Sequence, residues 1–234
     1  MTKSRYPYRY ETHMHTSEGS HCARESAREQ IEFYAQRGYT GVFVTDHFWG
    51  NGSCRVDKEL PFEEQVEQYF SFAEAAKKQG EKYGIDVFCG IEYSYRHTDF
   101  LIYGLAPEII KAHPEIPDMK PHEFTRLARE SGALVIQAHP FRLNSCSTII
   151  RLFQREVDGF EVVNGANDEH QNKMAEIFRK EYKLLKFAGS DNHGISKGKT
   201  HFLAGVDTTR RVKDEQDFVK IIKNGKYRIF GEEL

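Results

Sequence analysis

Seven short apolar runs alternate with longer amphipathic segments along this chain of 234 residues, and this alternation restricts the possible folds most strongly. Runs such as residues 42–44 and 133–136 are typical of strands buried on both faces of a parallel sheet. The segment at 61–83 has apolar side chains at helical spacing and precedes Gly84, a common helix terminator. Strands alternating with helices predict a parallel sheet covered by helices, and seven such units predict an α/β barrel of the TIM type.

The expected strands cover residues 8–16, 39–45, 85–89, 99–105, 133–137, 159–163 and 184–188. The expected helices between them cover residues 23–37, 61–83, 121–130, 147–155 and 168–182. A further strand is expected at 201–206, a helix at 215–223 and a short strand at 227–230. We expect one domain over residues 1–234, because α/β barrels of this length commonly form a single domain.

The charge balance is nearly even, with 33 lysines and arginines against 35 aspartates and glutamates. No basic excess is therefore available to gather a long nucleic acid or an anionic membrane surface. The apolar runs are too short to cross a bilayer, and residues 1–10 lack the apolar core of a signal peptide, so we expect a cytoplasmic protein. The cysteines are widely spaced, which predicts free thiols at Cys22, Cys54, Cys89 and Cys146.

Histidine and acidic side chains follow the apolar runs, at the positions where the strands of a barrel would end. His13 and His15 share one face of the first strand, because successive side chains of a strand alternate. The other members of this set lie at or just beyond the ends of later strands: Asp46, His47, Glu92, His139, Asn164, Asp191 and His193. Barrel enzymes build their active sites at this end, so we expect the set to converge there.

These side chains offer imidazole nitrogens and carboxylate oxygens without sulfur, a donor set that suits Zn, Mn or Fe. The set is larger than one ion requires, so several ions are expected. Glu92 can bridge two of them through its two oxygens. Paired ions can activate a water molecule for in-line displacement at phosphorus.

The sequence resembles the PHP family, which is named for polymerases and histidinol phosphatases. The resemblance spans nearly the whole chain and rests on five motifs in family order: His13-x-His15 with His21, Thr45-Asp46-His47, Gly90-Ile91-Glu92, His139-Pro140 and Gly189-Ser190-Asp191-x-His193. It implies a distorted (β/α)7 barrel with three divalent ions. It also implies hydrolysis of phosphate esters.

The resemblance implies three groups of metal ligands: His13, His15, Glu92 and Asp191 for a first ion; Glu92 and His139 for a second; and His21, His47 and His193 for a third. The fourth strand departs from the family pattern, because Asp99 stands where many members have a histidine. We expect Asp99 to complete the second group. His97, two residues earlier, is the alternative.

Other polar residues have a functional and an ordinary interpretation. Asp46 is a candidate catalytic residue as a general acid or base, but it can equally support a ligand histidine or stabilise a turn. Arg142 is a candidate phosphate clamp, because its planar fork matches phosphate oxygens, or else a solvated surface residue. Glu161 and Asn164 resemble a family Glu-x-x-Asn pattern with a supporting role. Lysines 197 and 199 can attract an anionic substrate or be simply solvated.

The function that we expect is hydrolysis of a phosphate ester by a hydroxide that bridges metal ions at a trinuclear site. The expected substrate is a small phosphomonoester or a short nucleotide rather than a long nucleic acid. One alternative is a regulatory PHP module that binds metal without catalysis. Another is an amidohydrolase acting on C–N bonds, although such barrels usually need a bridging carboxylated lysine, and no lysine is expected at a strand end. The sequence carries no signal for an oligomeric state.

Overall fold

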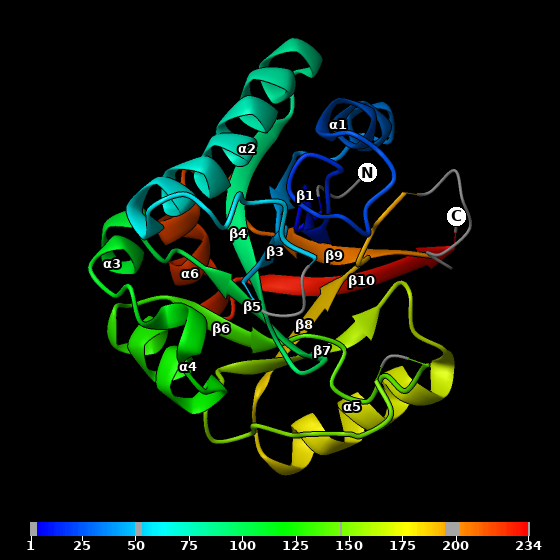
Figure 1. Ribbon diagram of the computed structural model, residues 1–234. Coiled ribbons are helices and arrows are strands. Elements are labelled where there is room, and N and C mark those ends of the chain that lie inside the picture. The colour runs from blue at the N-terminus through cyan, green and yellow to red at the C-terminus, as the bar shows by residue number, and fades with distance from the viewer. Residues whose placement is uncertain (1–3, 50–52, 146, 195–201, 234) are drawn as a thin grey trace.

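The computed structural model describes residues 4–49, 53–145, 147–194 and 202–233, and a curved sheet runs through its centre (Figure 1). The strands follow the spatial order β10-β9-β1-β2-β4-β5-β6-β7-β8, and β3 pairs with β4. Their bounds are β1 Tyr8–Met14, β2 Gly41–Val44, β3 His47–Phe48, β4 Asp86–Tyr95, β5 Thr98–Tyr103, β6 Leu134–Gln137, β7 Gly159–Asn164, β8 Leu185–Gly189, β9 Phe202–Thr208 and β10 Tyr227–Glu233. The seven expected strands correspond to β1, β2 and β4–β8, which confirms the α/β barrel.

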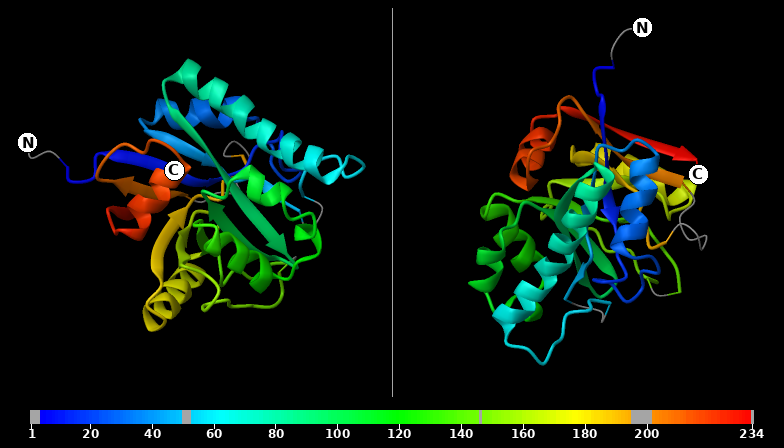
Figure 2. Two further views of the ribbon diagram at one scale, coloured as in Figure 1. Left: turned by 90° about the vertical axis from the view of Figure 1, so that its left-hand side faces the viewer. Right: turned by 90° about the horizontal axis from the view of Figure 1, so that it is seen from above.

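Helices cover the outside of the sheet, with α1 and α2 on one side and α5 on another (Figures 1 and 2). Their bounds are α1 Ala27–Gln36, α2 Phe62–Tyr83, α3 Pro107–Lys111, α4 Pro121–Glu130, α5 Glu169–Glu181 and α6 Glu215–Lys223, with a 3-10 turn at Ile116–Asp118. Capping explains several helix starts: the side chains of Ser26, Asp168 and Asp214 each accept a hydrogen bond from a first-turn backbone N–H. No described helix combines the length and the apolar character that a membrane crossing requires.

The barrel is distorted because its sheet is mixed. β4 and β5 form an antiparallel hairpin through a two-residue turn, in which Arg96 and His97 both have positive φ angles, 48° and 62°. Such a turn matches the twist of a hairpin. β5 also runs antiparallel to β6, and β9 runs antiparallel to β1 and β10. The fold therefore departs from an all-parallel barrel on these two sides.

The first and last barrel strands meet just beyond their carboxyl ends. Met14 forms a parallel bridge with Asn192. The backbone N–H of Asn192 donates to the carbonyl of His13 at 3.2 Å, and that of His15 donates to the carbonyl of Asn192 at 2.9 Å. These bonds bring residues 191–193 against the histidines of β1. Segments far apart in sequence therefore share one end of the barrel.

Apolar side chains fill the opposite end. Phe43, Phe88, Tyr103 and Phe187 point inward from different strands and pack with the buried face of α6. The rings of Phe43 and Phe218 are 4.2 Å apart between centroids, so α6 closes this end of the barrel. On β1, β2, β4 and β8 the buried aromatic residue precedes the polar one. The carboxyl ends of these strands are thus left to the polar side chains.

The expected helix at residues 147–155 is wrong, because this segment contains no helix. The side-chain amide of Gln137 donates to the carbonyl of Arg151 at 2.7 Å, and its oxygen accepts from the backbone N–H of Phe153 at 2.9 Å. These bonds replace the ones that a helix would form. The adjacent β-branched Ile149 and Ile150 also have low helix propensity.

Candidate metal centre

The carboxylate of Glu92, on β4, lies at the centre of four imidazoles. Its Oε1 is 3.1 Å from Nε2 of His13 and 3.2 Å from Nε2 of His139. Its Oε2 is 3.2 Å from Nε2 of His15 and 2.9 Å from Nδ1 of His47. Each oxygen faces a different pair of imidazoles, which is the arrangement that a carboxylate bridging two cations would have.

Asp191 follows β8 and reaches the same place from the other side. Its Oδ1 is 3.4 Å from Nε2 of both His13 and His15. Asp191 and His139 have positive φ angles, 54° and 29°, which non-glycine residues rarely adopt. Such backbone conformations persist where the surrounding structure enforces them, and they are often found at functional sites.

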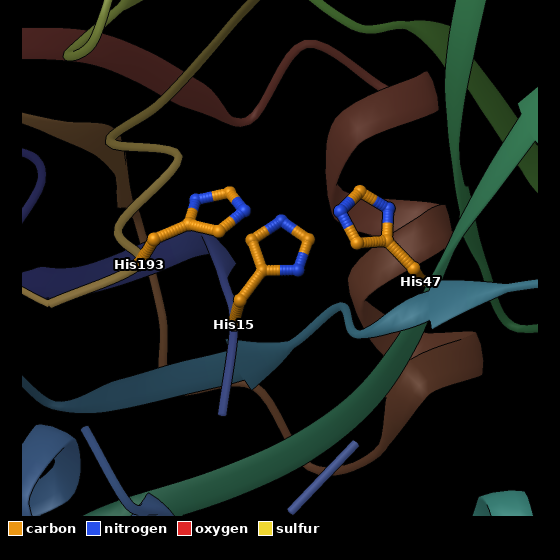
Figure 3. Close-up of side chains that lie close together, drawn as sticks. All are labelled: His15, His47 and His193. Carbon is orange, nitrogen blue, oxygen red and sulfur yellow. The ribbon is translucent and has the colours of Figure 1, made fainter. Parts of the chain in front are cut away.

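Two of these imidazoles, His15 and His47, also gather with a fifth, His193, with their rings facing one another (Figure 3). The ring centroids of His15 and His193 are 4.0 Å apart, and those of His15 and His47 are 4.5 Å apart. His15 follows β1, His47 begins β3 and His193 follows β8. The three residues each offer a ring nitrogen within 4.8 Å of the others, close enough to share an ion.

Glu161, buried on β7, orients two of the histidines. Its Oε1 is 2.9 Å from Nδ1 of His13, and its Oε2 accepts from the backbone N–H of His139 at 3.0 Å. Asn164 donates to the same Oε2 at 2.7 Å. A carboxylate that accepts the Nδ1 proton of a histidine leaves Nε2 as the free donor atom, which is the usual support of a metal-bound imidazole. The hydrogen bond from Asn164 to Glu161 explains the Glu-x-x-Asn pattern.

Asp46 supports the loop after β1 rather than facing the cavity. Its carboxylate accepts hydrogen bonds at 2.7 Å from the backbone and the hydroxyl of Thr16 and from the hydroxyl of Ser20. The Ser20 oxygen lies 3.3 Å from Nδ1 of His15. Of the three roles considered for Asp46, these contacts support the turn and the indirect positioning of His15. They do not support acid–base catalysis.

Asp99 reaches the second group of ligands from β5. Its Oδ2 is 3.7 Å from Nε2 of His139, and its Oδ1 is buried without a hydrogen-bond partner among the described residues. His97 occupies the exposed hairpin turn; both residues line the cavity and neither belongs to a close donor group in the described chain, but no contact between His97 and the other ligands is found among the described residues. The geometry therefore favours Asp99 over His97 as the ligand of the fourth barrel strand.

Arg142 is held by three protein oxygens at the edge of the site. Its guanidinium donates to Asp191 at 2.5 Å, to Asn164 at 2.6 Å and to Asn167 at 2.8 Å. The side chain still lines the cavity in front of the metal ligands. A fixed guanidinium at this position neutralises Asp191 and also presents positive charge to the cavity.

The adjacent side chains of His21 and Cys22 lie in different environments. The side chain of His21 is exposed, whereas that of Cys22 lines the cavity; neither residue belongs to a close donor group among the described residues. The cause lies in the backbone: the N–H of His21 donates to the carbonyl of Ser53 at 2.7 Å, and Ser20 pairs with Cys54. The exposed position of His21 does not support its place in the third ligand group, which stays a prediction from the family resemblance.

Five buried donor atoms in this cluster have no hydrogen-bond partner in the described structure: Nε2 of His13, Nε2 of His15, Oε2 of Glu92, Oδ1 of Asp99 and Oδ1 of Asp191. Buried polar atoms are almost always bonded, so a concentration of unpaired ones at a single place calls for an additional partner. Nitrogen and oxygen donors of this kind fit divalent cations. The residues present are thus suited to hold metal ions.

The electrostatics of the cluster also favour the binding of divalent cations. Burial disfavours the ionised form of Glu92, but the imidazoles of His13 and His47 outweigh it and hold the pKa of this carboxyl well below its usual value. Burial opposes protonation of His13, yet Asp191 and Glu161 raise its pKa well above the usual value. Without a metal, the buried acids are therefore balanced by protonated imidazoles. Divalent cations would replace these protons.

The sulfur of Cys22 takes part in the same electrostatics. Burial disfavours the thiolate, but hydrogen bonds with His193 and His47 outweigh it and lower the pKa of Cys22 to about 5. Burial opposes protonation of His193, while Asp191 and Cys22 together raise its pKa to about 9. Cys22, Cys54 and Cys89 are free thiols, as expected, and Cys22 differs from the other two in its lowered pKa.

The cluster opens into a cavity of about 430 Å³. Beyond the proposed ligands, the described residues lining it are mostly polar and include Arg142, Arg151, Asn144 and Ser147, with no lysine among them. The cavity has the size of a small-molecule site. Lysines 197 and 199 and Cys146 lie outside the described residues.

Glu11 also belongs to the architecture of the site, although the sequence gives no clear sign of it. Its buried carboxylate accepts hydrogen bonds from the backbone of His13 at 2.8 Å and of Ser190 at 3.0 Å, and from the hydroxyl of Tyr34 at 2.7 Å. These bonds join β1 to the segment after β8. An acid beside a His-x-His motif is the only signal that could have pointed to it.

Neither a protein-family model nor a curated protein matches the sequence. Solved structures do match the fold. A two-domain protein from Bacteroides vulgatus, which contains a predicted PHP-like metal-dependent phosphoesterase, has a TM-score of 0.68 at 15% identity over 98% of this chain and 66% of that protein. A proposed metal-dependent phosphoesterase from Bifidobacterium adolescentis has a TM-score of 0.60 at 14% identity, covering 92% of this chain and 96% of that one.

A third similar structure is an amidohydrolase from Chromobacterium violaceum, with a TM-score of 0.54 at 14% identity over 82% of this chain and 90% of that one. It was solved with bound sulfate and without metal. At these identities the comparisons establish architecture rather than activity. The chain has the distorted barrel fold of the PHP-like metal-dependent phosphoesterases.

Proposed function

We propose that this protein is a metal-dependent phosphoesterase that cleaves a small phosphomonoester or a short nucleotide at a site for three divalent ions. The observation that carries the proposal is the position of Glu92, whose two oxygens each face a separate pair of imidazoles at 2.9–3.2 Å. A carboxylate so placed can hold two cations side by side. Zn, Mn and Fe suit the nitrogen and oxygen donors around it.

The proposed ligand groups follow from these contacts. His13, His15 and Asp191 form one close donor group, and His13, Glu92 and His139 form another. Asp99 lies beside the second group, and His47 and His193 belong to the third. When bound, the metal ions supply an activated water and neutralise the charge that develops on the phosphoryl oxygens.

The protein's own residues prepare the site for an anionic substrate. Glu161 fixes the ring of His13 with Nε2 toward Glu92. Arg142 is immobilised by Asn164 and Asn167 at the cavity wall, so its remaining N–H groups can bind phosphate oxygens with little loss of side-chain entropy. The size of the cavity, about 430 Å³, supports a small substrate.

The test is hydrolysis of a generic aryl phosphate by the purified protein with added Mn or Zn. Glu92→Gln and His139→Ala are expected to reduce turnover by several orders of magnitude, whereas His122→Ala, a change of an exposed histidine on α4, is expected to leave it unaltered. Absence of turnover with every divalent metal would refute the proposal. Unchanged turnover in Glu92→Gln would refute it as well.

The similarity to an amidohydrolase keeps hydrolysis of C–N bonds as a second candidate. The absence of lysine among the described residues of the cavity argues against the carboxylated-lysine form of that chemistry. Parallel assays with amide and aryl phosphate substrates distinguish the two activities. A regulatory module that binds metal without catalysis would hold ions and hydrolyse neither substrate.

A further inference from the structure

We infer that the sulfur of Cys22 is a ligand of the ion held by His47 and His193, in the place that the family resemblance gives to His21. The inference rests on the proposed metal-dependent function and specifies the composition of its third ligand group. It adds sulfur to a donor set that is otherwise nitrogen and oxygen.

The position of Cys22 is fixed from both sides. On one side the N–H of His21 is bonded to the carbonyl of Ser53 at 2.7 Å, and on the other the N–H of Arg24 is bonded to the carbonyl of His193 at 2.8 Å. Cys22 therefore lies between the loop before α2 and the segment after β8. Its side chain lines the same cavity as the imidazoles of His47 and His193.

A second observation shows that this corner of the cavity needs a cation. His15, His47 and His193 each offer a ring nitrogen within 4.8 Å of the others, and Nε2 of His15 is fully buried without a hydrogen-bond partner in the described chain. In contrast, the His21 side chain is exposed. To take the place of Cys22, His21 would have to break its backbone bond to Ser53.

The donor set has chemical consequences. If His15 binds the ion beside Asp191, the thiolate of Cys22 and the imidazoles of His47 and His193 leave a coordination position open, as in catalytic zinc sites with three protein ligands. Thiolate is a soft ligand that favours Zn over Mn, whereas the carboxylate-rich groups around Glu92 and Asp191 accept either ion. The third position is therefore expected to be selective for zinc.

The experiment replaces the bound metal by Co²⁺ and measures the near-ultraviolet absorption that arises when a thiolate binds cobalt. Four proteins are compared: the unmodified chain, Cys22→Ser, His21→Ala and Cys89→Ser, the last being the same substitution on β4, where the backbone contacts Glu215. Bound cobalt per chain and the far-ultraviolet circular dichroism are measured on the same samples. The dichroism confirms that each variant is folded.

The expected result is loss of the thiolate–cobalt band and of one bound cobalt in Cys22→Ser only. Retention of the band in Cys22→Ser, or loss of a cobalt in His21→Ala instead, would overturn the inference. An unmodified protein that binds cobalt and hydrolyses aryl phosphate without the band would refute this inference alone. One that binds no cobalt would refute the proposed function too.

Discussion

Replacing Glu161 with glutamine exchanges one oxygen of a buried carboxylate for an amide NH₂ group. The carboxylate accepts three hydrogen bonds: Oε1 from Nδ1 of His13 at 2.9 Å, and Oε2 from the backbone of His139 at 3.0 Å and the side chain of Asn164 at 2.7 Å. A glutamine NH₂ at the Oε2 position would oppose two donors. At the Oε1 position it would oppose only one.

The orientation with the NH₂ group at the Oε1 position is therefore favoured, and it changes the tautomer of His13. The imidazole can accept a hydrogen bond from the amide if it moves its proton from Nδ1 to Nε2. Nε2 is the atom that lies 3.1 Å from Glu92 and 3.4 Å from Asp191, where the proposed ions would bind. The substitution thus protonates the ligand atom without altering the shape of the site.

The expected size of the effect is a loss of about 10–100-fold in metal affinity, or about 1.4–2.8 kcal/mol, as is usual when the partner of a metal-bound histidine is removed. The assay is competition for Zn²⁺ against a chromophoric chelator, with bound metal per chain measured after dialysis. Glu181→Gln makes the same chemical change at an exposed position of α5 and should leave affinity unaltered. Equal affinities for Glu161→Gln and the unmodified protein would refute the reasoning.

Three other predictions concern the same site. Gly189→Ala would place a Cβ 2.4 Å from Cβ of His13 and 2.7 Å from Glu161. It should destabilise the fold by about 1–3 kcal/mol in chemical denaturation and weaken metal binding. Gly132→Ala, whose added Cβ has no neighbour within 4 Å, should leave metal binding unchanged. Because the pKa of His193 is raised to about 9, a metal ion must displace the proton of His193 at neutral pH. The affinity for metal should therefore rise by up to about tenfold per pH unit from pH 7 and level off near pH 9. A flat pH profile in the chelator assay would contradict this prediction. Arg142→Ala should lower kcat/KM for aryl phosphate by about 10–100-fold, in line with the ~1.5–3 kcal/mol of a charged hydrogen bond, while exposed Arg126→Ala should match the unmodified enzyme.

Much of the fold and of the site follows from local sequence. Most barrel strand bounds agree to within two residues because apolar runs and turn residues specify them, but β4 continues past the expected end at residue 89 to Tyr95, so Glu92 lies within the strand. The convergence of His13, His139 and His193 follows from the rule that parallel strands present their carboxyl ends together. Strand bounds and the residues at strand ends can be predicted because they depend on residues that are close in sequence.

Other features depend on contacts that no local pattern encodes. His21 and Cys22 are adjacent, and only the pairing of Ser20 with Cys54 decides which of them faces the cavity. The role of Asp46 follows from the positions of Thr16 and Ser20, some thirty residues earlier. Residues 147–155 have helical spacing, yet Gln137 occupies the backbone groups that a helix would use.

The most direct test of the metal centre is a crystal structure of the protein grown with zinc, with anomalous diffraction measured on both sides of the zinc absorption edge. We predict anomalous peaks next to both oxygens of Glu92, one of them shared with His13 and His139, and a further peak beside His47 and His193. A map without anomalous density, in which Glu92 is hydrogen-bonded to protonated imidazoles alone, would contradict the account.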